Sequence, residues 1–248
     1  MGSVALQELT AMSRVARSRI RRGTGPIRVQ CTAMRRLTLA LVFVATSVSM
    51  NGQSALPPDI HPVSLSRLPP VQRADLDEEG KRIWNVLAGT GATIPLTGPS
   101  AVTMHSPKAA EPIAALNQYL RQTVAGPRYF ELSALIAARE LDQQYEWSGH
   151  EPTGLRAGLE QSVIDVVKFN RELTGLSEKD ATVIRLGRAM FRDHKVSPEL
   201  WTKTMQLFGR QGAMEVTMIM ADYAMAGYIL TAVDQQLPAD RKPLLPVR

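Results

Sequence analysis

Apolar residues recur with a helical period through most of the chain after residue 73. In the clearest example, Ile113, Leu116, Tyr119 and Leu120 share one helix face. No stretch of useful length alternates apolar and polar residues as a strand would, and no internal repeat is present. The pattern therefore predicts an all-α fold. The expected helices span residues 74–88, 108–123, 128–149, 159–170, 177–194 and 212–235.

Residue types at the helix ends support several of these bounds. Ser177 followed by Asp180 resembles a capping box. Ser197-Pro198 predicts a further helix start, because proline suits the first helical position. Pro152 and Gly154 are expected to interrupt or bend the chain after the 128–149 helix.

The segment 212–235 is apolar on nearly all sides and has Asp222 as its one mid-segment charge. A helix of this kind is buried in a core or between subunits. Because Glu215 and Asp222 are costly inside a bilayer, we expect no stable membrane insertion. The segment favours a homo-oligomer.

The first 55 residues differ from the rest and read as a leader. Met34-Arg35-Arg36 precedes the apolar run LTLALVFVA and a small, polar exit that ends near Ala55. This order is typical of a secretory signal peptide, and about nine apolar residues are too few for a spanning helix, which needs about 20. We expect the true start at Met34, cleavage near Ala55 and export to the periplasm or exterior. An Arg-rich transit peptide is the alternative.

Charge and cysteine content follow the same division. The leader carries eight of the 29 basic residues and one of the 23 acids, which leaves 21 bases against 22 acids beyond residue 55. A near-neutral body gives no electrostatic reason to bind nucleic acid. The single cysteine, Cys31, lies in the leader, so the mature chain is expected to lack a thiol.

A proline-rich arm, residues 56–72, follows the leader. The stretch LPPDIHPVSLSRLPP holds five prolines and should be extended and exposed. It is either a plain linker or a segment that wraps a neighbouring subunit. Residues 73–240 are expected to form one helical domain.

Candidate chemistry gathers between residues 128 and 158. Gln143, Glu146, Trp147 and His150 fall at i, i+3, i+4 and i+7, along one side of a helix. A histidine, a carboxylate and an amide are therefore expected to converge.

This stretch resembles the carboxymuconolactone decarboxylase and alkylhydroperoxidase D-like family. The resemblance rests on YEWSGHEP around His150, on FEL about nineteen residues upstream and on LRAGL after it, and it extends loosely over residues 108–236. It implies an alkylhydroperoxidase D-like helical bundle that forms trimers or hexamers.

The redox members of that family carry a Cys-x-x-Cys pair seven and four residues before the histidine. Those positions are Gln143 and Glu146 here, and neither side chain can form a thiolate. An antioxidant peroxidase of the alkylhydroperoxidase or peroxiredoxin type is therefore disfavoured. The family's upstream glutamate matches Glu131.

The decarboxylase branch uses no cofactor and removes CO₂ from an unsaturated lactone. The resemblance assigns proton donation to His150, with Glu131 or Glu146 orienting its ring. Arg139 or Arg156 is expected to hold a substrate carboxylate. Further candidate substrate contacts are Gln143, Tyr145 and Trp147, and core packing is the alternative for Tyr145 and Trp147.

A metal site is the weaker interpretation of the same residues. Glu146 and His150 could be two ligands with Glu131 as a third, but no second histidine joins them, so we expect neither metal nor cofactor. The expected function is lyase or isomerase chemistry, as of a carboxy-lyase, on a small carboxylated lactone or related organic acid. A non-catalytic oligomeric binding protein on the same fold is the alternative, so enzyme status stays open.

Overall fold

The computed structural model describes residues 56–92 and 96–246, and all of them belong to one unit, Gln53–Arg248. The predicted leader lies outside the described residues. Within the described part the chain is helical, without a strand, and His61 and Ser66 form an isolated bridge. The all-α prediction is confirmed. The helices are α1 (Glu78–Ala88), α2 (Gly98–Thr103), α3 (Pro107–Leu120), α4 (Pro127–Glu140), α5 (Gln144–Arg156), α6 (Gln161–Lys168), α7 (Glu178–Arg188) and α8 (Pro198–Ala232).

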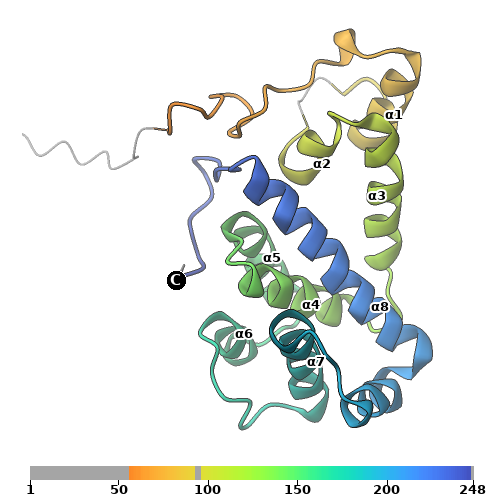
Figure 1. Cartoon of the computed structure of the whole chain (residues 1–248), viewed down its shortest axis with the longest axis vertical. Coiled ribbons are helices and arrows are strands. Elements are labelled where there is room, and N and C mark those ends of the chain that lie inside the picture. Colours follow the sequence, from red (N-terminus) through yellow and green to blue (C-terminus); the bar gives the residue numbers. More distant parts are fainter. Residues whose placement is uncertain (1–55, 93–95, 247–248) are drawn as a thin grey trace, which may run out of the picture. The chain divides into compact units, whose positions relative to one another are not determined.

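Helix α4 forms the centre of the bundle. It packs against α5, α7 and α8, and Figure 1 shows α8 running diagonally beside it. Every residue from Phe130 to Arg139 is buried, because neighbours cover α4 on all sides. The main apolar core includes Leu135 and Ile136 of α4 and Val216 of α8. The bundle thus holds the buried helix α4 against α5, the helix that carries the candidate histidine.

The predicted helix over residues 128–149 is wrong, since it divides into α4 and α5. Asp142 has a left-handed backbone with φ of 49°, a conformation that aspartate tolerates better than most residues. Gln143 then caps α5, accepting a hydrogen bond from the Tyr145 amide at 3.0 Å. Pro152 lies inside α5 without ending it. The break turns α5 back along α4, so that the two helices face each other.

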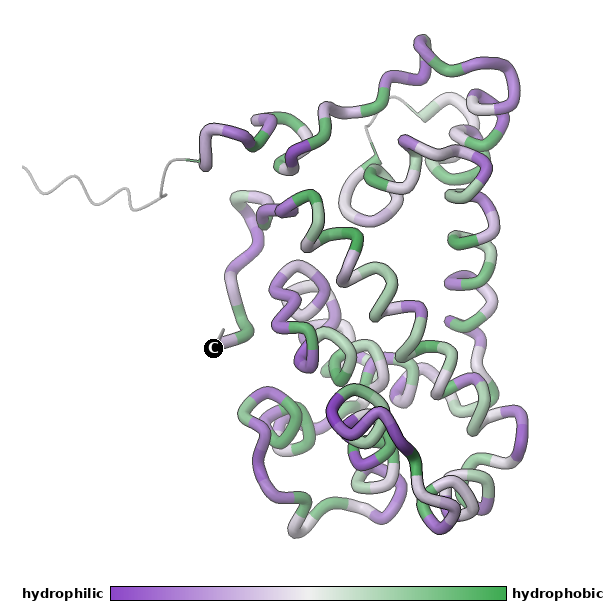
Figure 2. Tube along the Cα trace, viewed as in Figure 1, coloured by the Kyte–Doolittle hydropathy of each residue, from purple (hydrophilic) through white to green (hydrophobic). Residues whose placement is uncertain are grey.

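Helix α8 is longer than predicted and has a non-helical residue, Gly209 (φ 71°, ψ 173°), that separates two helical stretches. Ser197 caps the first, as predicted, by accepting from the Leu200 amide at 3.2 Å. The second contains the apolar segment, and green apolar positions recur along it in Figure 2. It is not covered on all sides within this unit, because Met214 and Tyr228 are exposed.

The start of α7 is also as predicted, with the Ser177 hydroxyl accepting from the Asp180 amide at 3.1 Å. α7 itself ends at Arg188, and a π-helical turn, Ala189–Asp193, carries the chain to His194. In the described part, no helix combines the length and the apolar character needed to cross a bilayer.

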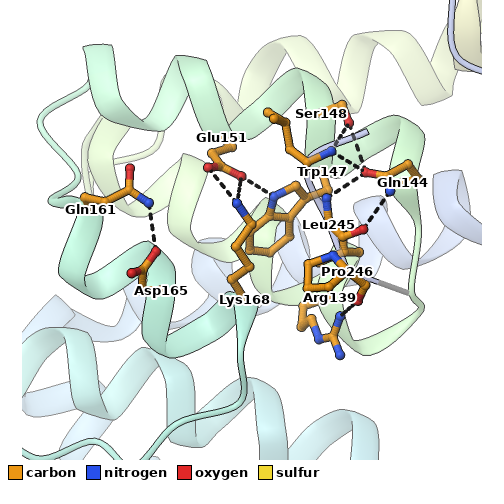
Figure 3. A network of polar contacts seen from close by, with 11 residues as sticks. Arg139, Gln144, Trp147, Ser148, Glu151, Gln161, Asp165, Lys168, Leu245 and Pro246 are labelled. Carbon is orange, nitrogen blue, oxygen red and sulfur yellow. Dashed lines mark hydrogen bonds and ion pairs between the residues drawn. The ribbon is translucent and has the colours of Figure 1, made fainter. Parts of the chain in front are cut away.

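The arm and the C-terminal tail both pack against this unit. The Arg67 amide donates to the Val233 carbonyl at 2.8 Å, and the Gln236 amide donates to the Leu65 carbonyl at 2.7 Å. The arm therefore binds the end of α8 in its own chain. Figure 3 shows the tail held by Gln144 of α5, which accepts from the Leu245 amide at 2.8 Å and donates to the Leu245 carbonyl at 2.7 Å.

Candidate acid–base site

His150 lies between two carboxylates. Its Nδ1 is 2.7 Å from Glu131 Oε2 on α4, and its Nε2 is 3.5 Å from Glu146 Oε2 on α5. Glu146 and His150 are four residues apart, so both project from one side of α5. The imidazole also packs edge-to-face against Tyr223 of α8, with ring centroids 4.6 Å apart. Three helices therefore fix the position of one ring.

This environment changes the proton affinity of His150. Burial alone lowers the pKa of an imidazole, because it penalises the charged form. Here the hydrogen bonds and negative charges of Glu131 and Glu146 outweigh burial and raise the pKa of His150 to about 9. The side chain is therefore an imidazolium at neutral pH, with a proton on each nitrogen.

A cavity of about 370 Å³ opens beside this ring, within the size range of small-molecule sites. Its wall combines polar and apolar side chains. Its polar lining comprises Asn117, Gln118 and Arg121 of α3, Glu146 and His150 of α5, Asp222 and Tyr223 of α8, and Ser100 and Thr103 of α2. Its apolar lining comprises Pro99, Ala110, Ile113, Ala114, Met225, Ala226 and Ile229.

A chain of hydrogen bonds joins several polar residues of the cavity lining. Arg121 donates to the Tyr223 hydroxyl at 3.2 Å and to Asn117 Oδ1 at 3.0 Å. Asn117 in turn donates to Asp222 Oδ2 at 2.8 Å. Burial, with the charge of Glu146 adding to it, raises the pKa of Asp222 against the opposing hydrogen bond from Asn117. The cavity thus combines a guanidinium, an imidazolium and two carboxyl groups.

The structure brings together the three residues predicted to be catalytic. His150 and Glu146 line the cavity, whereas Glu131 lies behind His150 and holds Nδ1. Glu131 is therefore a positioning residue by geometry.

The other candidates on α5 lie elsewhere. Gln143 is directed toward α8, donating to the Gly227 carbonyl at 3.2 Å and to Thr231 Oγ1 at 3.0 Å. Tyr145 packs with Val102 and Leu230. Trp147 is fully buried in the main core and donates to Glu151, as Figure 3 shows. Glu146 and Trp147 are neighbours and project about 100° apart around α5, so Trp147 enters the core while Glu146 lines the cavity. The expected convergence on one face is therefore not formed.

Neither predicted arginine reaches the cavity. Arg139 donates to the Pro246 carbonyl at 2.7 Å and pairs with Asp142, while exposed Arg156 donates to Thr153 at 2.9 Å. Arg121 lines the cavity instead. Of the site residues that sequence reasoning missed, Asp222 gave a signal as a charge inside an apolar helix. Arg121 and Asn117 gave none beyond their i, i+4 spacing.

A metal site was the weaker interpretation of the same residues. Within residues 56–92 and 96–246, no three His, Cys, Asp or Glu side chains form a group with the arrangement of a metal site. The expectation that no metal or cofactor binds stays a prediction. Gln143, a capping residue, and Glu146, the His150 partner, are the two residues that sequence resemblance aligned with redox cysteines.

Comparison with known proteins shows the fold. No protein-family model matches the chain, and no curated protein matches it. A peroxidase-related protein from Ralstonia eutropha JMP134, described as an alkylhydroperoxidase AhpD core, is similar with a TM-score of 0.55 and 16% identity over 73% of this chain and 95% of that one. A variant of the debrominase Bmp8, in complex with 2,3,4-tribromopyrrole, is similar with a TM-score of 0.50 and 16% identity over 68% and 90%. The alkylhydroperoxidase D-like fold is thus confirmed.

Proposed function

We propose that the chain is a cofactor-free acid–base enzyme of the lyase or isomerase type that acts on a small organic acid, such as a carboxylated lactone. The observation that carries this proposal is the buried His150 ring, held between Glu131 and Glu146 at the wall of a cavity. A protonated group beside a small-molecule cavity can deliver a proton to a reacting carbon.

In the lyase form, the bond between the ring carbon and the substrate carboxylate breaks, and CO₂ leaves. The electron pair moves through the conjugated double bond onto the lactone carbonyl. It then returns to a carbon of the conjugated system, which forms a bond to the proton from His150 Nε2. Solvent returns the proton to His150. Glu131 holds Nδ1 throughout.

Two other functions compete with this proposal. A non-catalytic binding protein needs only the cavity, and the bound pyrrole of the debrominase neighbour supports a small ring as ligand in either case. A thiol peroxidase is disfavoured because Gln143 and Glu146 occupy the cysteine positions and neither can act as a thiolate.

Screening carboxylated lactones and related acids for turnover tests the proposal. We expect His150→Gln, which fills the space but holds no transferable proton, to lower kcat by about 10²-fold or more. The control is His105→Gln, an exposed histidine outside this cavity, which should retain wild-type turnover. Equal turnover in both variants removes His150 from the mechanism, and ligand binding without turnover favours the binding protein.

A further inference from the structure

Glu146 has an unmatched oxygen. The residue is only 6% exposed, and its Oε1 is buried without a hydrogen-bond partner among the described residues. Its other oxygen, Oε2, faces His150 at 3.5 Å. Nearly all buried polar groups in folded proteins are hydrogen-bonded, and an unmatched carboxylate oxygen is more costly than a neutral group. The site therefore lacks a donor that a ligand can bring.

Rotation of the Glu146 carboxylate does not remove this deficit. The last torsion of a glutamate is soft, so the two oxygens can exchange places at little cost. Whichever oxygen faces His150 Nε2, the other still needs a donor. Glu146 lines the cavity, so a turn of its soft carboxylate torsion can present the unmatched oxygen to a donor on a molecule bound there.

The nearby donors are already directed elsewhere. Asn117 donates to Asp222, and Arg121 donates to Asn117 and to the Tyr223 hydroxyl. The remaining face of the guanidinium stacks over Phe130, 4.9 Å from the ring centroid, which fixes its orientation at the cavity wall. Nε and one N–H of Nη2 make the two hydrogen bonds of Arg121, so the N–H groups of Nη1 and the second N–H of Nη2 are left for an anionic group.

The size of the ligand follows from the same contacts. Arg121 is 3.2 Å from the Tyr223 hydroxyl, and the Tyr223 ring is 4.6 Å from the His150 ring, so a single side chain separates the guanidinium from the imidazolium. A molecule that reaches from Arg121 to Glu146 needs a body about as long as one ring. The apolar wall, with Ile113, Met225 and Ile229, suits such a body.

We propose that the cavity selects a single-ring organic anion that carries a hydroxyl or N–H donor, with its anionic group on Arg121 and its donor on the unmatched oxygen of Glu146. This inference rests on the proposed function, and it narrows the substrate class. Hydroxylated or N–H-bearing ring acids are favoured over lactones that have no donor.

A pair of isosteric probes tests the donor requirement with the wild-type chain. 4-Hydroxybenzoate and 4-fluorobenzoate differ at the group across the ring from the carboxylate, which donates a hydrogen bond in the first and cannot in the second. By calorimetry at neutral pH, 4-hydroxybenzoate should bind about tenfold more tightly, the ratio that a hydrogen bond to a charged acceptor supports. Equal affinities, or no binding of either probe at millimolar concentration, overturn the proposal.

Matched variants locate the acceptor. Glu146→Gln should reduce the preference below about threefold, because a neutral amide is a weaker acceptor. Asp222→Asn alters the other carboxyl group of the cavity and should keep the preference. Arg121→Gln should weaken both probes by a similar factor and leave their ratio unchanged. If Asp222→Asn removes the preference and Glu146→Gln retains it, the donor assignment is wrong.

The outcomes separate this inference from the proposed function. If the probes bind with the expected preference and no ring acid turns over, the catalytic proposal fails and the recognition proposal stands. If turnover depends on His150 but the favoured substrates carry no donor, the catalytic proposal stands and the recognition proposal fails.

Discussion

His150 links the chemistry of the site to the stability of the fold. Its pKa is about 9 in the folded chain, against an ordinary value of 6.5, so the folded state binds a proton that the unfolded state releases above pH 6.5. The stabilisation is complete below about pH 6.5 and is lost as the pH rises through about 9. We expect the free energy of unfolding to fall by about 3 kcal/mol across that window.

Urea denaturation at a series of pH values measures this fall. The His150→Gln variant provides the comparison, since it has no titrating group at position 150. Its free energy of unfolding should change less between pH 6.5 and 9. Parallel profiles in the two proteins would show that His150 does not gain its proton affinity from folding.

The family resemblance paired Glu131 with His150, and the two side chains meet in the structure. Helix geometry alone would not have paired them, because residues 128–149 were expected to form one helix, along which the two positions lie far apart. Arg121 and Tyr223 were not found, because they come from α3 and α8, and their convergence depends on tertiary packing. Arg139 looked equally suitable as a charge, yet it binds the C-terminal tail.

At the scale of helices, the contact between α4 and α7 depends on a glycine. A Cβ added at Gly187 would lie 2.3 Å from Ile136 Cγ2, which is shorter than any tolerated contact. We expect Gly187→Ala to destabilise the fold by about 1–3 kcal/mol through overpacking. Chemical denaturation of the purified variant measures the change.

Gly149 of α5 is a matched control for that substitution. A Cβ there would meet nothing closer than Arg241 Nη1 at 3.6 Å, an ordinary contact. Gly149→Ala should therefore be neutral or stabilise the chain by up to about 1 kcal/mol through helix propensity. A Gly187→Ala variant as stable as this control would contradict the close packing of α7 on α4.

Helix starts that have a local cap were more predictable than the break between α4 and α5. The caps at Ser177 and Ser197 were visible in sequence, because each side chain bonds its own helix start. The break between α4 and α5 was missed because nothing in ELDQQ marks it as glycine or proline would. It depends on Asp142 adopting a left-handed backbone and on the Gln143 cap. Without that break, Glu131 would not face His150.

At the scale of the whole molecule, α8 presents apolar side chains that this unit leaves uncovered. Tyr228 is 65% exposed and Met214 is 47% exposed. Burial of such residues between copies would stabilise an oligomer, so self-association stays a prediction. Light scattering of the chain from residue 56 at micromolar concentration should give at least a dimer.

A charged substitution on the exposed surface of α8 tests whether this helix mediates self-association. Tyr228→Lys should shift the mass toward the monomer, whereas Val86→Lys, at an exposed apolar position on α1, should leave it unchanged. A monomeric wild-type chain at micromolar concentration would contradict the prediction of self-association. Equal effects of the two substitutions would remove α8 as the contact surface.

The central claim is that this fold holds His150 as an imidazolium between two carboxylates, ready to donate a proton. NMR titration of the imidazole resonances measures it most directly, with His150 assigned by its absence in His150→Gln. We predict a midpoint near pH 9 in the wild type. The midpoint should be lower in Glu131→Gln, because that variant loses the negative charge of the carboxylate beside His150 Nδ1. A His150 midpoint at or below 6.5 in the wild type would contradict the account.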